Sequence, residues 1–183
     1  MIKAFVIADI HSPDEFSMPE IKPEQFDLVL TLGDISVNTI DYILLMSKQV
    51  KVLGVLGNHD PKEIPGLDDH HGKIVEFKGI RFGFLKGAPK YKDEPNHLTE
   101  KEMLKAVNKM GPVDVMVSHA PPPCAAPNED RVHKGFEAFD LYIQRHKPKY
   151  WLHGHLEKFY TKDINGTKII GVDRKRPLPL DFS

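Results

Sequence analysis

Side chains that can bind metal ions recur along this chain, close behind short apolar runs. They are carboxylates, imidazoles and one amide, and in chain order they are Asp9, His11, Asp34, Asn58, His59, Asp60, His119 and His155. Carboxylate, imidazole and amide oxygen together suit borderline divalent ions such as Mn²⁺, Fe²⁺ or Zn²⁺. Because no thiolate belongs to the set, a structural zinc-finger site is excluded. The residue types therefore predict a metal site built from oxygen and nitrogen ligands.

Buried β-strands are expected to position these side chains. Short apolar runs predict strands at 2–8, 27–32, 50–56, 113–118 and 150–153. In open α/β sheets, ligands collect beyond the carboxyl ends of the strands. Five strand ends are therefore expected to converge on one rim, and each brings a side chain capable of metal binding.

A glycine precedes three of the candidate ligands, namely Asp34, Asn58 and His155. Glycine lacks Cβ, so it permits tight turns and a close approach of the backbone to the site. Asp-x-His and Gly-Asp are each common by chance, whereas Gly-Asn-His-Asp is more specific and the ordered set of five motifs is more specific still. The motifs are therefore informative in combination.

Helices are expected between the strands. Apolar spacing predicts a helix over 37–50, which Ser36 or Asn38 could cap. A capping-box pattern at Thr99 predicts the start of a second helix, and a third is expected over about 135–146. Strands that alternate with helices predict an α/β architecture.

Two-residue turns predict two hairpins. Lys78-Gly79 separates the runs 73–77 and 80–85, and Asn165-Gly166 separates a second pair of runs between residues 159 and 172. Hairpins added to strand–helix units imply sheets whose edges are antiparallel. Since the sequence has no internal repeat or linker, a single domain over residues 1–183 is expected.

The composition excludes several classes of protein. The formal net charge of -1 gives no overall field for nucleic acid or an acidic membrane, so neither is indicated as a partner. No apolar run is long enough to span a bilayer. Cys124 is the single cysteine and cannot form an internal disulfide, so a cytoplasmic location is expected.

The ordered motifs resemble the signature of the calcineurin-like metallophosphoesterases, over the span from Asp9 to His155. This resemblance implies an α/β fold, a β-sandwich of two mixed sheets flanked by helices in a four-layer αββα arrangement. It also implies two divalent metal ions, with Asp9 and His11 on the first, Asp34 bridging both, and Asn58, His119 and His155 on the second.

Two further residues take catalytic roles by the same resemblance. His59 would contact the substrate phosphate and protonate the leaving group, and Asp60 would orient the His59 ring. Imidazole titrates near neutral pH and is therefore a suitable proton donor. Cys124 lies outside any Cys-x5-Arg phosphate loop and is interpreted as an ordinary loop residue.

One position departs from the family pattern. Many members end with Gly-His-x-His, whereas this chain has Gly154-His155-Leu156-Glu157. Either Glu157 supplies an oxygen ligand, which favours harder ions such as Mn²⁺ or Mg²⁺, or it points away and leaves the first ion to the other ligands and water. Mn²⁺ is the first expectation, with Fe, Zn or Ni as alternatives; His153 is expected to have no role in the site.

The function that follows is a metal-dependent phosphoesterase that acts through a metal-bridging hydroxide on a small phosphate ester. A compact site without a cap domain favours a phosphodiester over a monoester. The alternative is a catalytically weakened scaffold or protein-binding module of the same fold, which a retromer subunit resembles. The Glu157 departure favours the alternative, whereas His59 and Asp60 favour the enzyme.

Other polar residues belong either to the site or to an ordinary surface. The loop residues Arg131, His133 and Lys134 could meet the substrate, and so could a rim of Lys86, Lys90 and Lys92. For both groups a solvated surface is at least an equal interpretation. His70-His71 has no useful partner spacing and is predicted to lie on the surface.

Overall fold

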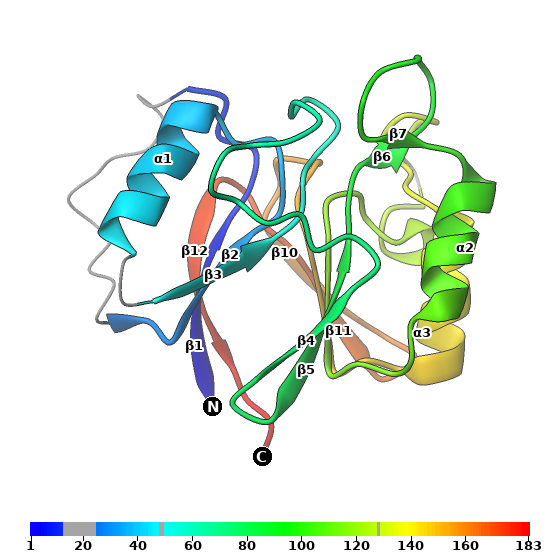
Figure 1. Ribbon diagram of the computed structural model, residues 1–183. Helices are drawn as coiled ribbons and strands as arrows, with labels where there is room; N and C mark the ends of the chain where they lie inside the picture. The colour runs from blue at the N-terminus through cyan, green and yellow to red at the C-terminus, as the bar shows by residue number, and fades with distance from the viewer. Residues whose placement is uncertain (13–24, 48–49, 128) are drawn as a thin grey trace.

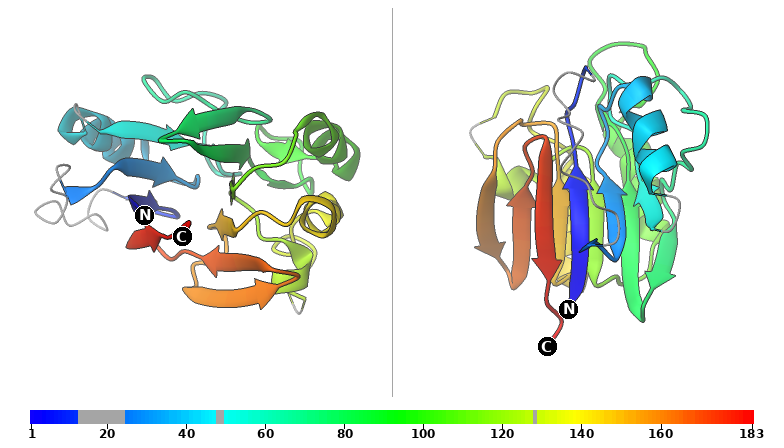
Figure 2. Two further views of the ribbon diagram at one scale, coloured as in Figure 1. Left: turned by 90° about the horizontal axis from the view of Figure 1, so that it is seen from below. Right: turned by 90° about the vertical axis from the view of Figure 1, so that its left-hand side faces the viewer.

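Two β-sheets pack face to face in the computed structural model, which describes residues 1–12, 25–47, 50–127 and 129–183 (Figure 1). The first sheet has the strand order β12-β1-β2-β3 and the second has the order β10-β11-β9-β8-β5-β4. Helix α1 lies against the outer face of the first sheet, and α2 and α3 lie against the outer face of the second (Figures 1 and 2). This four-layer arrangement confirms the predicted fold class.

The four-stranded sheet carries the first three motifs. Its strands are β1 (Ile2–Ile7), β2 (Leu28–Thr31), β3 (Lys51–Gly54) and β12 (Lys175–Leu180). Strands β1, β2 and β3 are parallel, so their carboxyl ends reach the same rim, and β12 pairs antiparallel with β1. The prediction of antiparallel edges is wrong for β3, which forms a parallel edge because β2 and β3 are joined through α1.

The six-stranded sheet carries the last two motifs. Its strands are β4 (Ile74–Phe77), β5 (Ile80–Leu85), β8 (Val115–Ser118), β9 (Tyr150–His153), β10 (Tyr160–Ile164) and β11 (Thr167–Gly171). The inner strands β5, β8, β9 and β11 are parallel, and β4 and β10 form antiparallel edges. Both predicted hairpins are therefore confirmed.

Two of the described helices begin where their caps predict, and a third begins without a side-chain hydrogen bond at its cap. Helix α1 (Val37–Met46) is capped by Ser36, α2 (Glu100–Lys109) has the full capping box at Thr99, and α3 (Glu137–His146) follows Phe136. Helix α1 ends earlier than predicted, at Met46, and residues 48–49 lie outside the described part. The described helices are too short or too polar to span a bilayer. Shorter elements are β6 (Ala88–Pro89), β7 (His97–Leu98) and a 3-10 turn at Pro123–Ala125.

Three apolar layers explain why polar and apolar residues do not alternate along the inner strands. Val6, Leu30 and Phe84 belong to the layer between the two sheets. Ile40 of α1 packs in a second layer, and Trp151 packs in a third layer under α2 and α3. Sheets covered on both faces bury nearly continuous apolar strands. Polar side chains are consequently displaced to the strand ends.

Candidate metal centre

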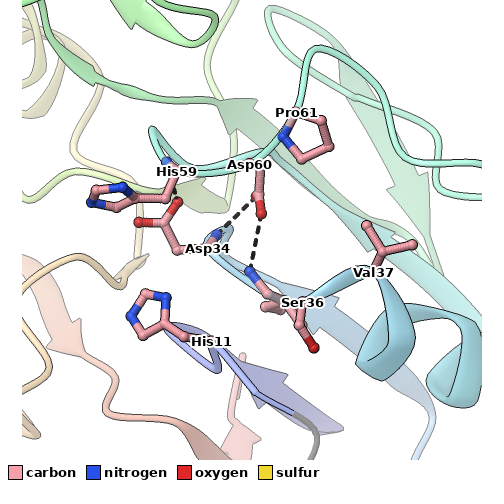
Figure 3. A pocket seen from close by; sticks show the side chains of 8 residues that line it. His11, Asp34, Ser36, Val37, His59, Asp60 and Pro61 are labelled. Carbon is pink, nitrogen blue, oxygen red and sulfur yellow. Dashed lines mark hydrogen bonds between the residues drawn. The ribbon is translucent and has the colours of Figure 1, made fainter.

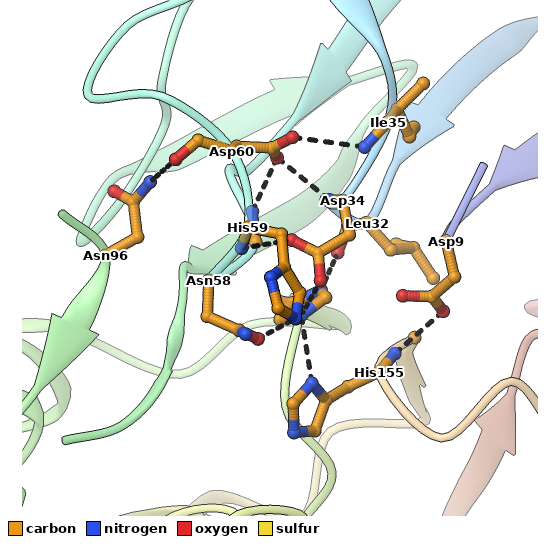
Figure 4. Close-up of polar contacts among 12 residues, drawn as sticks. Asp9, Leu32, Asp34, Ile35, Asn58, His59, Asp60, Asn96 and His155 are labelled. Carbon is orange, nitrogen blue, oxygen red and sulfur yellow. Dashed lines mark hydrogen bonds and ion pairs between the residues drawn. The ribbon is translucent and has the colours of Figure 1, made fainter. Parts of the chain in front are cut away.

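Four side chains from separate strand ends meet at the rim, and Figure 4 labels three of them, Asp34, Asn58 and His155. Nε2 of His119 lies 2.9 Å from Oδ1 of Asn58, 3.2 Å from Oδ2 of Asp34 and 3.1 Å from Nδ1 of His155. Ligand atoms of Asp34, His119 and His155 all lie within 4.8 Å of one another. We call Asp34, Asn58, His119 and His155 the inner cluster. The sequence motifs predicted that these residues meet, although 121 positions separate the first from the last (155 − 34).

The two imidazoles of the inner cluster are fixed by backbone carbonyls. Nδ1–H of His119 donates to the carbonyl of Leu32 at 2.8 Å, and Nε2–H of His155 donates to that of Val132 at 3.1 Å. In the neutral rings, the opposite nitrogens are then unprotonated and face each other at 3.1 Å. Two lone pairs this close repel unless a proton or a cation lies between them. The arrangement therefore fits a divalent ion, whose histidine ligands usually donate their other N–H to a carbonyl or carboxylate.

The charges of the inner cluster lead to the same conclusion. Burial opposes the imidazolium of His119, yet the carboxylate of Asp34 raises the pKa of His119 to about 9. Burial likewise opposes the ionised form of Asp34, but His119 holds the pKa of Asp34 well below its usual range. Burial, followed by His119, lowers the pKa of His155 to about 3. Without metal, a proton on His119 thus balances Asp34, and a divalent cation would have to displace it.

Asp9 borders the inner cluster from the end of β1. Its Oδ2 accepts the backbone N–H of His155 at 2.8 Å, and its side chain is buried. Burial raises the pKa of Asp9 to about 7. A cation beside this carboxylate would favour its ionised form, since opposite charge lowers the pKa of an acid.

His11 and Glu157, which we call the outer pair, face solvent. Nε2 of His11 lies 3.6 Å from Oε1 of Glu157, and their side chains are 47% and 62% exposed. Glu157 therefore turns toward the side of the site that holds His11. Whether Glu157 binds an ion stays a prediction.

Several of the candidate ligands have strained backbone conformations. Asp9, Asp34 and His155 have φ values of +52°, +54° and +69°, which L-residues rarely adopt. Such strain persists where surrounding structure enforces it, and it concentrates at functional sites. A Cβ on Gly57 would lie 2.1 Å from Oδ1 of Asp34, so the strand-end loops touch as the glycine motifs predicted. Tight loop contact thus turns these side chains toward the rim.

Asp60 ties two of these loops together. Its Oδ2 accepts the backbone N–H groups of Asp34 and Gly57, both at 2.8 Å, and its Oδ1 accepts that of Ile35 at 3.1 Å. Asn96 Nδ2 donates to the backbone carbonyl of Asp60 at 3.1 Å. The described hydrogen bonds of the Asp60 carboxylate thus go to backbone rather than to the His59 ring. The family role of orienting that ring stays a prediction.

His59 stands at the mouth of the site. Its backbone N–H donates to Oδ1 of Asp34 at 2.8 Å, and its ring lies edge-on to that of His11, with 6.2 Å between centroids (Figure 3). The ring is therefore outside the inner cluster and close to where a substrate would enter. This position suits a residue that contacts substrate without binding metal.

Some polar residues differ from expectation. The prediction of a surface position is wrong for His70, which is buried; its Nδ1 lies 3.3 Å from the carbonyl of Gly54, and its ring packs on Phe84. Packing between sheet and loop covers it, which a pair of adjacent histidines does not indicate. His153 is buried, and its Nε2 accepts the hydroxyl of Tyr160 at 2.7 Å; its expected lack of a role in the site stays a prediction.

The flanking cations are paired with carboxylates. Lys86 pairs with Asp69, Lys90 with Asp93, and Lys92 with Glu94. This pairing favours an ordinary surface over a substrate-binding rim. The loop of Arg131, His133 and Lys134 does reach the site, because Val132 holds His155 and the His133 ring lies 5.2 Å from the His155 ring.

Comparisons with known proteins agree with this fold. The family model of calcineurin-like phosphoesterases matches residues 2–158. A solved protein of Thermus thermophilus is 12% identical with a TM-score of 0.65, over 95% of this chain and 90% of its own. A dimetal phosphatase from Danio rerio is 15% identical with a TM-score of 0.63, over 94% and 87%. Vps29 from Entamoeba histolytica, complexed with Zn²⁺, is 18% identical with a TM-score of 0.50, over 94% and 74%. No curated protein matches the chain in sequence.

Proposed function

The chain belongs to the calcineurin-like phosphoesterase family, and on that premise we propose that it hydrolyses a phosphate ester with two divalent metal ions. One observation supports this proposal most. In the inner cluster, Nε2 of His119 and Nδ1 of His155 face each other at 3.1 Å while carbonyls hold their other nitrogens. This arrangement is unfavourable in neutral rings without a cation and favourable with one.

Each residue has a distinct part in the proposed centre. The inner cluster would hold one ion, and Asp34, with two carboxylate oxygens, would also reach the other ion beside Asp9, His11 and Glu157. Bound divalent ions would lower the pKa of water and neutralise charge on phosphoryl oxygens. His59 would bind the phosphate and give a proton to the leaving oxygen. Asp60 would hold the loops that carry Asp34 and Asn58.

The finer parts of the proposal rest on ligand chemistry and size. Mn²⁺ suits the mixture of carboxylate, amide and imidazole ligands, and Fe, Zn or Ni are the alternatives. An open site favours small phosphodiesters over monoesters, and a chain of net charge -1 gives no general attraction for nucleic acid. A single cysteine is in keeping with a cytoplasmic location.

The wild-type chain should hydrolyse bis-p-nitrophenyl phosphate with Mn²⁺ and lose this activity when a chelator is added. The His59→Ala variant then tests the proposal. The variant should turn over about 10²–10⁴-fold more slowly, because a positioned proton donor contributes on that scale. Metal content by elemental analysis should stay at the wild-type level. A parallel loss of metal would make His59 a ligand and contradict its assigned role.

A scaffold role is the second candidate, and the outer pair favours it. Glu157 is 62% exposed at the position where many family members have a histidine. A protein that serves only as a scaffold does not need to transfer protons. Wild-type protein that binds two ions but hydrolyses neither a diester nor p-nitrophenyl phosphate would favour the scaffold over the enzyme.

A further inference from the structure

A pocket of about 220 Å³ adjoins the metal centre (Figure 3). His11, His59 and Asp34 line the side toward the centre, whereas Val37 and Pro61 form the opposite side. For scale, an engineered apolar cavity of about 150 Å³ binds benzene. The pocket therefore has room for one aromatic ring or a group of similar size.

No described residue that lines this pocket is a lysine or arginine. Two of its polar side chains, Ser36 and Asp60, already have partners: the Ser36 hydroxyl lies 2.7 Å from that of Thr39 and accepts the backbone N–H of Thr39 as the α1 cap. Both oxygens of Asp60 accept backbone N–H groups. A group that extends past the two histidines, His11 and His59, would thus meet apolar faces and the Asp60 carboxylate, with no lysine or arginine among the described lining residues to balance a negative charge.

We propose that this pocket receives the leaving group of the substrate and selects a compact, uncharged organic group, with Val37 as a specificity-determining residue. The inference rests on the proposed function. In that reaction, water adds its oxygen to phosphorus and loses a proton to solvent, and the bond from phosphorus to the leaving oxygen breaks. The leaving oxygen takes a proton from His59, which solvent then protonates again. Since His59 lines the pocket, the group attached to that oxygen extends toward Val37 and Pro61.

Val37 offers a direct way to change the selectivity. Its side chain lies at the first position of α1 and is 39% exposed, so lysine can replace it without entering the core. Leu45 of the same helix is 58% exposed and does not line the pocket. Leu45→Lys therefore makes the same change in net charge outside the pocket and serves as the matched control.

Binding tests the pocket independently of catalysis. Dissociation constants for 4-hydroxybenzamide and 4-hydroxybenzoate are measured by isothermal titration calorimetry on metal-free and Mn²⁺-loaded protein. The wild type should prefer the amide, and Val37→Lys should shift the ratio toward the carboxylate by about 2–5-fold, the scale of an exposed ion pair. Leu45→Lys should leave the ratio unchanged. Equal binding of both ligands to the wild type, or equal effects of the two lysines, would overturn the inference.

Turnover separates this inference from the proposed function. Aryl methyl phosphodiesters with a para-carboxamide or para-carboxylate are compared with Mn²⁺ present. The wild type should favour the carboxamide in kcat/KM, and Val37→Lys should narrow that preference. Selective binding without metal-dependent turnover of either ester would count against the proposed function alone. Turnover that favours the carboxylate would overturn the proposed selectivity for an uncharged leaving group, while the proposed phosphoesterase activity would still hold.

Discussion

The inner cluster and the outer pair are two parts of one site with different degrees of order. In the inner cluster, His119 is fully buried and lies within 3.2 Å of three other candidate ligands. In the outer pair, about half or more of each side chain is exposed and the closest charged atoms are 3.6 Å apart. Backbone carbonyls fix the rings of the inner cluster, whereas the outer pair is partly exposed to solvent.

This difference implies unequal metal affinities. A ligand set that is already arranged loses little conformational entropy on binding, whereas exposed long side chains must be ordered. We therefore expect the inner position to bind its ion more tightly than the outer position. Removal of metal by dilution or weak chelators should then proceed in two steps, with the outer ion lost first.

The largest effect is expected for His119→Ala. This change removes the central ligand of the inner cluster, so one ion should be lost and activity should fall by about 10³-fold or more, as expected when several kcal/mol of transition-state stabilisation disappear. Elemental analysis and turnover of bis-p-nitrophenyl phosphate measure both. His70→Ala removes another buried histidine outside the site and should retain both ions. Equal metal loss in the two variants would mean that packing, not ligation, explains the effect.

A smaller effect is expected for Asp60→Asn. An amide has one acceptor oxygen, so at least one of the three backbone N–H groups at Asp60 would face an NH₂ group. Loops that carry Asp34 and Asn58 should then shift, and metal affinity should fall about 10–100-fold, as for other residues that support ligands. Isothermal titration with Mn²⁺ measures this loss.

Asp114→Asn is the control for Asp60→Asn, because Asp114 accepts the backbone N–H of Arg81 and belongs to none of the ligand motifs. It should leave Mn²⁺ affinity unchanged. Unaltered affinity in Asp60→Asn together with slower turnover would favour the family role of Asp60 in orienting His59. That result would contradict the role of Asp60 in holding the loops that carry Asp34 and Asn58.

The smallest effect is expected for Glu157→His, which introduces the residue common in the family. Since the outer pair is exposed, activity should change by less than about tenfold, while preference should move from Mn²⁺ toward Zn²⁺ because imidazole is a softer ligand than carboxylate. Competition between the two ions, read by elemental analysis, measures the shift. Loss of the outer ion in this variant would show that a carboxylate is required there. Glu76→His on β4 is the control, because it adds a histidine to the surface outside the site and should leave the metal preference unchanged.

Much of the site could be anticipated because its information is local. Each motif follows an apolar run, and the parallel order of β1, β2 and β3 brings their ends together without further detail. The carbonyls of Leu32 and Val132 could not be anticipated, because every residue has a carbonyl and only the folded chain selects these two. The position of Glu157 beside His11 depends equally on tertiary structure.

The elements missed or misplaced have similar physical reasons. Strand β12 escaped prediction because Pro177 and Pro179 suggest a loop, yet an edge strand tolerates proline where no ladder bond is needed. His70 was misplaced because burial of a polar ring depends on partners such as Phe84 and Gly54, distant in sequence. Local sequence patterns thus predicted the strands and helices better than the tertiary contacts between them.

The position of β12 has a consequence for how the protein is made. It is the last of the strands, yet it pairs with the first, and the carbonyl of Arg174 just before it accepts the backbone N–H of Ala8, beside Asp9, at 2.7 Å. Pairings this distant along the chain form slowly, because a long loop must close before they can stabilise it. During synthesis, Asp9 therefore emerges long before the strand that completes its sheet. Full assembly of the centre has to wait until β12 has been translated as well.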